Sequence, residues 1–483
     1  MALARKIAYN VVLNSFLKVF STVALSLLSI RLITEYLGQD GFGKYATILA
    51  FFAFFSAIAD LGLGSVTARE ISRSGADESK ILGNVIALRL SASLLLIVLS
   101  PIIIFIFGYS EEVEIGILIA ALATLFSALS TVLNGIFQKY LAMDKVAMVE
   151  FCGKILQVGL VILIVREDWG FLPIAGTLLA SVSFNALLTL LLSRRFATFK
   201  LHFDVAYWRT FLRESLPMGM TAIITFAYFK LDTILLSLLQ SNAEVGIYNV
   251  AYKIMENLIF FPAMLCGLIL PLLSRYIFTD QKQFKEIADK TFKVFVIMVI
   301  PIVIGTWFLA GDIVSIVSGS GFPEAAPVLK MLIFSLGAIF FGSYFNMLLI
   351  VGNAQKKLMQ TLFFAALFNV SLNLFMISRY SYMGAATTAI ITEIIVVLLT
   401  GFLTYKYIHY IPSSEHVGRA LLSGAVMALS LYFLAPVSFF LAGFAGMASY
   451  LAMLWMTKAI SRSEIMSLFQ KKESPFPVEP LLP

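Results

Sequence analysis

The sequence predicts an all-α integral membrane protein with about fourteen transmembrane helices. Hydrophobic residues make up 60% of the 483 residues and charged residues only 13%. Typical globular proteins contain about 45–50% apolar and about 25% charged residues. The apolar runs are about 20 residues long and recur along the whole chain, which is the length of a transmembrane helix. They lack the period-two alternation of a β-barrel, so we expect helices.

Fourteen apolar spans follow one another along the chain. They are residues 9–33, 44–66, 81–107, 115–136, 146–165, 173–193, 217–239, 247–270, 291–309, 329–350, 359–378, 384–405, 417–435 and 437–459. Of the lysines and arginines between the spans and at their ends, twenty-five fall on the side of the N-terminus and four on the other side. Since basic residues gather on the cytoplasmic side, we expect both termini to be cytoplasmic. The net charge of +7 then reflects topology and predicts no nucleic-acid partner.

Two segments outside the spans have a distinct character. The connection Arg194–Ser215 places Trp208, Phe211 and Leu212 on one helical face, which predicts an interfacial helix before the seventh span. The tail, residues 461–483, is rich in proline, and we expect it to be disordered.

An internal repeat relates the two halves of the chain. Gly43 and Tyr45 open the second span, and Gly246 and Tyr248 open the eighth, with a separation of 203 residues in both cases. Weaker echoes follow, such as LAMDK before the fifth span and GNAQKK before the eleventh. Six spans are thus repeated in the same orientation. Parallel repeats place a substrate path between two lobes that rock in alternating access.

This repeat predicts the domain organisation. We expect a six-helix lobe over residues 1–205, and a second six-helix lobe with the preceding interfacial helix over residues 206–410. Two extra helices then occupy residues 411–460 and the tail follows.

Motifs of catalysis are missing from the sequence. There is no Walker A motif, no glycine-rich nucleotide fingerprint, no C-x-x-C and no H-E-x-x-H. We therefore expect neither an enzyme nor a bound cofactor or metal. A transporter of this kind needs an ion gradient, the gradient of its substrate, or a partner as its source of energy.

Charges inside the apolar spans are the main chemical signal. A charge at the centre of a membrane helix costs roughly 2.5–3.5 kcal/mol on insertion scales. Each of these charges must therefore be paired or line a polar path. The stretch Pro217–Pro262 carries Lys230, Asp232, Lys253 and Glu256. Lys253 and Glu256 can pair at i, i+3, but Lys230 and Asp232 are two residues apart and need partners from another helix or water.

These charges are specific to the second lobe. At the offset of 203 residues, Lys230 and Lys253 correspond to Leu27 and Ala50. We therefore expect the function to depend mainly on the charges that the second lobe adds to the shared frame.

The first lobe carries further intramembrane charges. Lys18, Asp60, Arg89 and Lys154 lie at a similar distance from the cytoplasmic ends of their spans and could meet at one depth, where Asp60 could neutralise Lys18 or Arg89. Lys154 follows Glu150 at i, i+4, which favours a local helical pair.

Two other charged positions stand apart. Glu393 has no cation at i±3 or i±4 and is a candidate for proton coupling. Arg31 lies near the outer end of its span, one turn before Glu35, and is expected to snorkel. In total, six intramembrane cations stand against five acids, a count that does not by itself predict an anionic substrate.

The residues from Arg31 to Ser72 carry a family resemblance. This stretch, RLITEYLGQDGFGKYATILAFFAFFSAIADLGLGSVTAREIS, resembles the N-terminal signature of the polysaccharide-biosynthesis flippases. The matching motifs are Leu37-Gly38, Gly43-Lys44-Tyr45, Ala59-Asp60-Leu61-Gly62, Lys230 to Asp232, Glu244 to Tyr248, and Ala251 to Lys253. The likeness covers roughly residues 5–410 and points to the O-antigen and exopolysaccharide translocases (Wzx type) of an exporter superfamily.

The resemblance implies a flippase in a prokaryotic inner membrane. It would move an undecaprenyl-diphosphate-linked oligosaccharide from the cytoplasmic to the outer leaflet, beside a polysaccharide polymerase and chain-length proteins. A proton or sodium gradient is the expected coupling. We expect the diphosphate to bind near four cations, Lys18, Arg89, Lys230 and Lys253. Four acids are expected to couple transport or balance charge, namely Asp60, Asp232, Glu256 and Glu393.

Three other functions fit parts of the same pattern. A multidrug or cation antiporter would use the same two lobes with acids at its centre. A flippase of the peptidoglycan precursor lipid II is a closer variant. A scaffold of an envelope assembly complex would transport nothing and would not need the repeat.

Overall fold

The computed structural model describes residues 24–73 and 75–459, which form helices joined by short connections. The helices are α2 (Ser26–Asp60), α3 (Leu63–Ile71), α4 (Glu78–Phe107), α5 (Glu111–Lys139), α6 (Met143–Glu167), α7 (Phe171–Ser193), α8 (Val205–Leu239), α9 (Asn242–Tyr276), α10 (Gln281–Ser318), α11 (Ala325–Val351), α12 (Gln355–Ile408), α13 (Val417–Leu434) and α14 (Phe439–Met456). Within the described ranges no strand occurs. Lys18, the beginning of the first expected span and the tail 461–483 lie outside the described residues.

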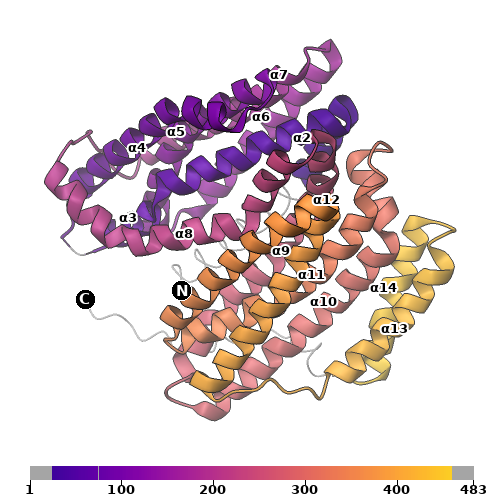
Figure 1. Cartoon of the computed structure of the whole chain (residues 1–483). Helices are drawn as coiled ribbons and strands as arrows, with labels where there is room; N and C mark the ends of the chain where they lie inside the picture. The colour runs from indigo at the N-terminus through magenta and orange to yellow at the C-terminus, as the bar shows by residue number, and fades with distance from the viewer. Residues whose placement is uncertain (1–23, 74, 460–483) are drawn as a thin grey trace.

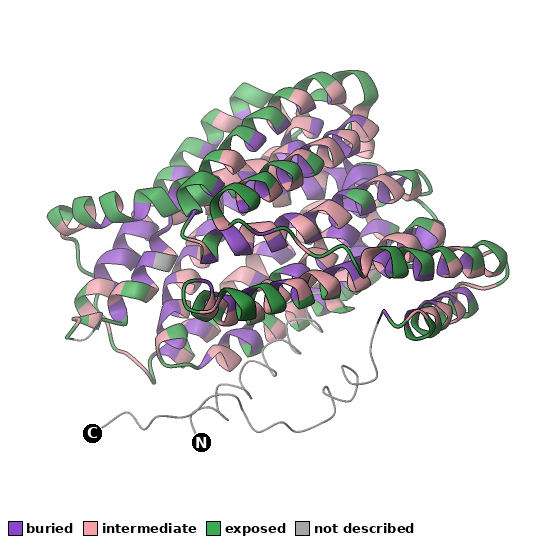
Figure 2. Ribbon diagram, turned by 90° about the horizontal axis from the view of Figure 1, so that it is seen from below, coloured by how far each residue is buried: buried purple, intermediate pink, exposed green. Residues whose placement is uncertain are grey.

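Twelve of these helices are long and apolar enough to cross a membrane. Two of the twelve are broken: α2 at Gly38 (φ 66°, ψ −170°) and α12 at Ser381 (φ 49°, ψ −136°). These breaks lie where the sequence places the turns between the first and second spans and between the eleventh and twelfth. The predicted fold class, an all-α multi-pass membrane protein, is confirmed. Exposed residues lie largely on the outward faces of the helices, as lipid contact requires (Figure 2).

The second expected span ends earlier than predicted. Leu61 (φ 41°) and Gly62 (φ 76°) adopt left-handed conformations, which end α2 after Asp60 and begin α3 at Leu63. A left-handed residue stops the helical hydrogen-bond ladder and is readily adopted by glycine.

The interfacial helix expected before the seventh span is not a separate element. It forms the first turns of α8, which begins at Val205 and continues through Pro217 to Leu239. The Asp204 carboxylate caps this helix by accepting from the Tyr207 amide at 3.0 Å.

The helices form two groups that lie side by side (Figure 1). The first contains α2 to α7 and the second α9 to α14, while α8 packs on α2, α3 and α4 and also on α12 and α9. The helix axes of the two groups converge at the end that carries the turn between α8 and α9, which we call the α8–α9 end, and diverge toward the opposite end (Figure 1).

The repeated glycines mark the place where the two groups cross. A Cβ atom added to Gly43 would lie 1.7 Å from the backbone oxygen of Asn242, and one added to Gly246 would lie 2.3 Å from that of Gln39. Gln39 and Asn242 are themselves related by the 203-residue offset. Each copy therefore contacts the equivalent position of the other, as in a two-fold symmetric interface. The repeat thus fixes how α2 packs on α9.

The weaker echo between LAMDK and GNAQKK is also structural. Leu141 (φ 53°) and Asn353 (φ 59°) both adopt the left-handed conformation at corresponding turns. In both turns the following alanine donates its amide to the carbonyl five residues earlier, at 2.8 Å. The same chain reversal therefore precedes α6 and α12.

We predict that Gly246→Ala destabilises the protein by about 1–3 kcal/mol, because the added methyl group overpacks the crossing with α2. Gly267→Ala in the same helix is the matched control, since no atom lies within 4 Å of its added Cβ. Thermal unfolding of the purified protein in detergent measures both. An unchanged melting temperature for Gly246→Ala would show that the crossing is looser than described.

Candidate functional site

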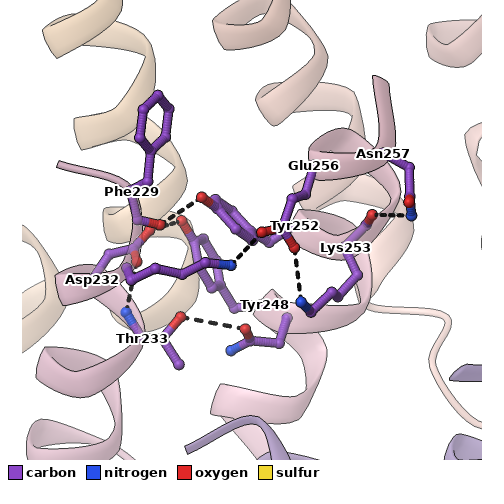
Figure 3. Close-up of polar contacts among 10 residues, drawn as sticks. Phe229, Asp232, Thr233, Tyr248, Tyr252, Lys253, Glu256 and Asn257 are labelled. Atoms are coloured by element: carbon purple, nitrogen blue, oxygen red, sulfur yellow. Dashed lines mark hydrogen bonds and ion pairs between the residues drawn. The ribbon is translucent and has the colours of Figure 1, made fainter. Parts of the chain in front are cut away.

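Glu256 joins two of the predicted lysines at the centre of the α8–α9 hairpin. Lys230 Nζ lies 2.6 Å from Glu256 Oε1, and Lys253 Nζ lies 2.8 Å from Glu256 Oε2 (Figure 3). Lys230 also lies over the ring of Tyr252, with 4.7 Å from Nζ to the ring centroid. Lys230 thus finds its partner on the neighbouring helix, and one carboxylate serves two ammonium groups.

Asp232 is held in a different environment from Lys230. It is 7% exposed, and its carboxylate accepts from the Tyr248 hydroxyl and from the Thr233 amide, the latter at 2.7 Å (Figure 3). Thr233 also donates to the side chain of Asn249 at 3.3 Å. These bonds tie α8 to α9 and leave Asp232 a structural partner of the repeated tyrosine.

A central cavity of about 550 Å³ lies between the two groups of helices. It is bounded by α2, α6, α7, α8 and α9. Its charged residues are Lys154, Lys230, Lys253 and Glu256. Its uncharged polar residues are Ser26, Ser29, Tyr45, Gln157, Ser181, Asn185, Thr233, Asn249 and Asn257. Three lysines against one carboxylate give an excess of positive charge, which the nearly balanced count of intramembrane charges along the sequence does not predict.

Lys154 lines this cavity although the sequence analysis did not place it in the diphosphate site. The i, i+4 spacing suggested Glu150 as its local partner, and in the structure the Lys154 ammonium donates to Gln157 Oε1 at 3.1 Å and lines the central cavity. Its position opposite α8 and α9 depends on how the two helix groups meet. The first lobe therefore contributes a cation to the cavity, but this cation is Lys154 and not Arg89, the first-lobe residue that was expected there.

Arg89 lies outside the central cavity. Its Nη2 atom is 2.8 Å from Asp60 Oδ1, and both residues line a second cavity of about 260 Å³ between α2, α4, α5 and α8, which we call the Arg89 cavity. The structure therefore separates Arg89 from Lys230 and Lys253, and it pairs Arg89 with Asp60, one of the two ion pairs that the sequence allowed for this acid. Lys18, the fourth expected cation, lies outside the described residues.

Glu393 lies in a third environment, deep in the second helix group. It is 6% exposed and has no ion-pair partner among the residues that the structure describes. It lines two small cavities of about 20 and 100 Å³, and Tyr228 lines both as well. Asp232, Asn369 and Asn373 complete the polar wall of the smaller one. This region therefore gathers two buried carboxyl groups away from the lysines.

Arg31 connects the two groups of helices at the α8–α9 end. Its Nη1 atom donates to the backbone oxygens of Ser315 and Ile316 in the last turn of α10, at 3.0 and 2.7 Å, and Nη2 pairs with Glu35 at 2.6 Å. A cation is favoured at a helix C-terminus. We call this contact the Arg31 latch. The Arg31 guanidinium thus bonds both to its expected neighbour Glu35 and to α10, and its expected snorkelling stays a prediction.

Family comparisons agree with this architecture. Residues 4–277 match the family described as polysaccharide biosynthesis protein, and residues 217–375 match the MatE family. The chain is 24% identical over 211 residues to the probable flippase AglR of Haloferax volcanii, a match that covers 43% of this chain and 44% of AglR. The chain thus spans less than half the length of the curated relative that it matches.

Two solved structures share the fold over most of their length. The lipid II flippase MurJ in an inward closed conformation superposes with a TM-score of 0.78 at 18% identity, covering 95% of this chain and 100% of that one. An inward-facing multidrug resistance MATE family transporter of the MOP superfamily gives 0.66 at 15% identity, covering 82% and 98%. At these identities the likeness concerns the fold.

We predict that Arg31→Gln opens the α8–α9 end, because charge-assisted hydrogen bonds to α10 contribute about 1.5–3 kcal/mol each to the closed arrangement. In a chain carrying Cys152→Ser and Cys266→Ser, Ala46→Cys places a thiol in the central cavity. An impermeant thiol reagent added on the side of the α8–α9 end should label it at least fivefold faster.

The control for this prediction is Lys330→Gln. Lys330 lies over the Trp307 ring near the start of α11, so its replacement removes a cation without removing the latch. A labelling rate that rises equally in both variants, or in neither, would contradict a gating role for Arg31.

Proposed function

This chain belongs to the polysaccharide biosynthesis protein family, and we propose that it carries a polyprenyl-diphosphate-linked oligosaccharide across the membrane. It is a flippase-family membrane transporter of the MOP superfamily. The observation that carries the finer proposal is the excess of lysines over carboxylates in the central cavity. An O-antigen or exopolysaccharide repeat unit is the proposed cargo.

The cavity lowers the main energetic barrier to this movement. A diphosphate cannot enter lipid unaided, because burying an unpaired charge is prohibitive. In the central cavity Lys154, Lys230 and Lys253 offer ammonium donors that form strong charge-assisted bonds to phosphate. Glu256 pairs with both Lys230 and Lys253, so each lysine can exchange this carboxylate for phosphate. The polyprenyl tail stays in lipid.

The two lobes would alternate around this cavity. The Arg31 latch and the glycine crossing join the helix groups at the α8–α9 end, while the groups diverge at the opposite end (Figure 1). We propose that residues 1–205 and 206–410 form the moving lobes and that residues 411–460 add a peripheral helix pair. The charge distribution supports an inner-membrane location with cytoplasmic termini. A polysaccharide polymerase and chain-length proteins are the proposed partners.

Energy coupling is assigned to the acidic region of the second helix group. Glu393 is buried without a cation beside it in the described part of the chain, so its charge can be neutralised by a proton or a sodium ion. Asp232 lines the same small cavity and is linked through Tyr248 to the α9 helix that bears Lys253. A change in charge there can therefore alter the packing of the hairpin that carries the lysines.

The alternatives differ in the charge of their cargo. A cationic drug would meet three lysines in the central cavity, so the cavity disfavours a multidrug antiporter of cations. A lipid II flippase carries the same diphosphate and remains the second candidate, supported by the fold shared with MurJ. Transport of lipid II alongside the native lipid-linked glycan in one assay separates these two substrates.

We predict that Lys253→Gln and Lys154→Gln each lower the flipping rate at least tenfold, because a hydrogen bond to a charged group contributes about 1.5–3 kcal/mol. Lys253→Gln leaves Lys230 and Glu256 as a neutral pair, so the protein should still fold. The measurement is a leaflet assay with lipid-linked oligosaccharide in proteoliposomes. Lys406→Gln, an exposed lysine in the last turn of α12, is the control. Flipping that is unchanged in both cavity variants would refute the proposed role.

We predict that Glu393→Gln abolishes the response of transport to an ion gradient. In the same proteoliposomes, an imposed proton or sodium gradient should raise the flipping rate of the wild type severalfold. The flipping rate of Glu393→Gln should stay at the value measured without a gradient. Glu286→Gln, which removes an exposed carboxylate paired with Lys290, should respond as the wild type does. A normal response of Glu393→Gln would exclude it as the coupling group.

A further inference from the structure

The Arg89 cavity lies one helical turn along α2 from the central cavity. Ala53 lines the central cavity and Ser56 lines the Arg89 cavity, and three residues of helix rise about 4.5 Å. On α8, Ala222 lines the Arg89 cavity two turns before Lys230 lines the central one. A single head group can therefore extend from one cavity into the other.

The chemistry of the two cavities differs. The central cavity carries excess positive charge, whereas the Arg89 cavity contains one guanidinium and one carboxylate, already paired at 2.8 Å. Its other polar groups are four hydroxyls, those of Ser56, Thr124, Ser127 and Thr131, and the remaining lining residues are alanines. A charge-balanced, hydroxyl-lined cavity of about 260 Å³ favours a small uncharged polar ligand over an anion.

Arg89 retains donors that its protein partners do not use. It is 3% exposed, and neither Nε nor Nη1 has an acceptor among the described residues; the hydroxyl of Ser56 also has no partner there. Buried donors of this kind require an acceptor. Sugar hydroxyls both accept and donate hydrogen bonds, so they can satisfy the guanidinium and the hydroxyls and also donate to the Asp60 carboxylate.

The A-D-L-G motif holds this pair in place. The left-handed break at Leu61 and Gly62 starts α3 beside Asp60, whose Oδ1 accepts from the Gly64 amide at 3.3 Å as well as from Arg89. A Cβ added to Gly64 would lie only 3.3 Å from that oxygen. The motif therefore orients the carboxylate that in turn orients the guanidinium.

We propose that the Arg89 cavity binds a sugar ring of the head group while the lysines of the central cavity bind the diphosphate next to it. This inference rests on the proposed function. It assigns Arg89, Asp60, Ser56 and Ser127 to recognition of the glycan, and it explains why Arg89 is separated from the lysines. A lipid diphosphate without a sugar would make no contacts in this cavity, so the cavity would not raise its affinity.

The test compares two lipids that share the diphosphate. The purified full chain in nanodiscs is titrated with undecaprenyl diphosphate and with lipid-linked oligosaccharide extracted from the native membrane, and native mass spectrometry measures both affinities. The double variant Ser56→Ala, Ser127→Ala should reduce the preference for the glycosylated lipid at least fivefold. Arg89→Lys, which keeps a cation beside Asp60, should reduce it at least tenfold. Affinity for undecaprenyl diphosphate should stay within twofold of the wild type.

Two controls make the outcomes distinct. Ser93→Ala removes a buried hydroxyl of α4, one turn from Arg89, that does not line the cavity, and it should change neither affinity. Lys253→Gln should weaken both lipids equally. If Arg89→Lys lost affinity equally for both lipids, the cavity would bind phosphate and not sugar. If the serine double variant kept the wild-type preference for the glycosylated lipid, the cavity would not be a sugar site. Either result overturns the proposal. A wild type that binds neither lipid would overturn the proposed function itself.

Discussion

The close approach of α2 and α9 at Gly43 and Gly246 is the constraint on which the rest of the structure depends. Each glycine lies against a backbone carbonyl of the other helix, so the two helices cross with no side chain between them. On α2, residues from Ser26 to Ile33 line the central cavity before this crossing and residues from Tyr45 to Ala53 line it after the crossing, and Arg31 lies in the first of these stretches. On α9, Lys253 and Glu256 follow two to three turns beyond Gly246. The crossing therefore sets the distance between the latch, the lysines and the opposing lobe.

The intramembrane charges are divided among three environments with different electrostatic character. The central cavity has an excess of lysines, the Arg89 cavity holds a balanced ion pair, and the region around Glu393 holds carboxyl groups that form no ion pair with the described residues. A buried charge is tolerated where it is paired or faces a polar cavity. Because the three environments are separate, the lysines can bind an anion, the Arg89 cavity can bind an uncharged group, and the carboxyl groups near Glu393 can bind a cation. The lysines and these carboxyl groups then do not neutralise one another.

The two lobes share a frame but contribute unequally to the central cavity. The α8–α9 hairpin supplies Lys230, Lys253 and Glu256, and the bonds from Tyr248 and Tyr252 back to α8 brace it (Figure 3). The first lobe supplies Lys154 and an amide-rich wall on α6 and α7. Symmetry therefore accounts for the crossing, whereas Lys230 and Lys253, which correspond to Leu27 and Ala50 at the repeat offset, belong to the second lobe alone.

The sequence by itself determined the fold class, the positions of the membrane spans and the internal repeat, because apolar run length and fixed residue spacing are properties of the chain. It also predicted that Lys230 and Asp232 do not pair with each other and need other partners, since residues at i, i+2 do not face each other on a helix. It could not decide which charges share a cavity. Lys154 has a local partner in the sequence and also lines the cavity of the α8 and α9 lysines, while Arg89, whose pairing with Asp60 the sequence allowed, lies in a different cavity from these lysines. Only the tertiary structure decided these groupings, because they depend on how helices distant in sequence pack across the glycine crossing.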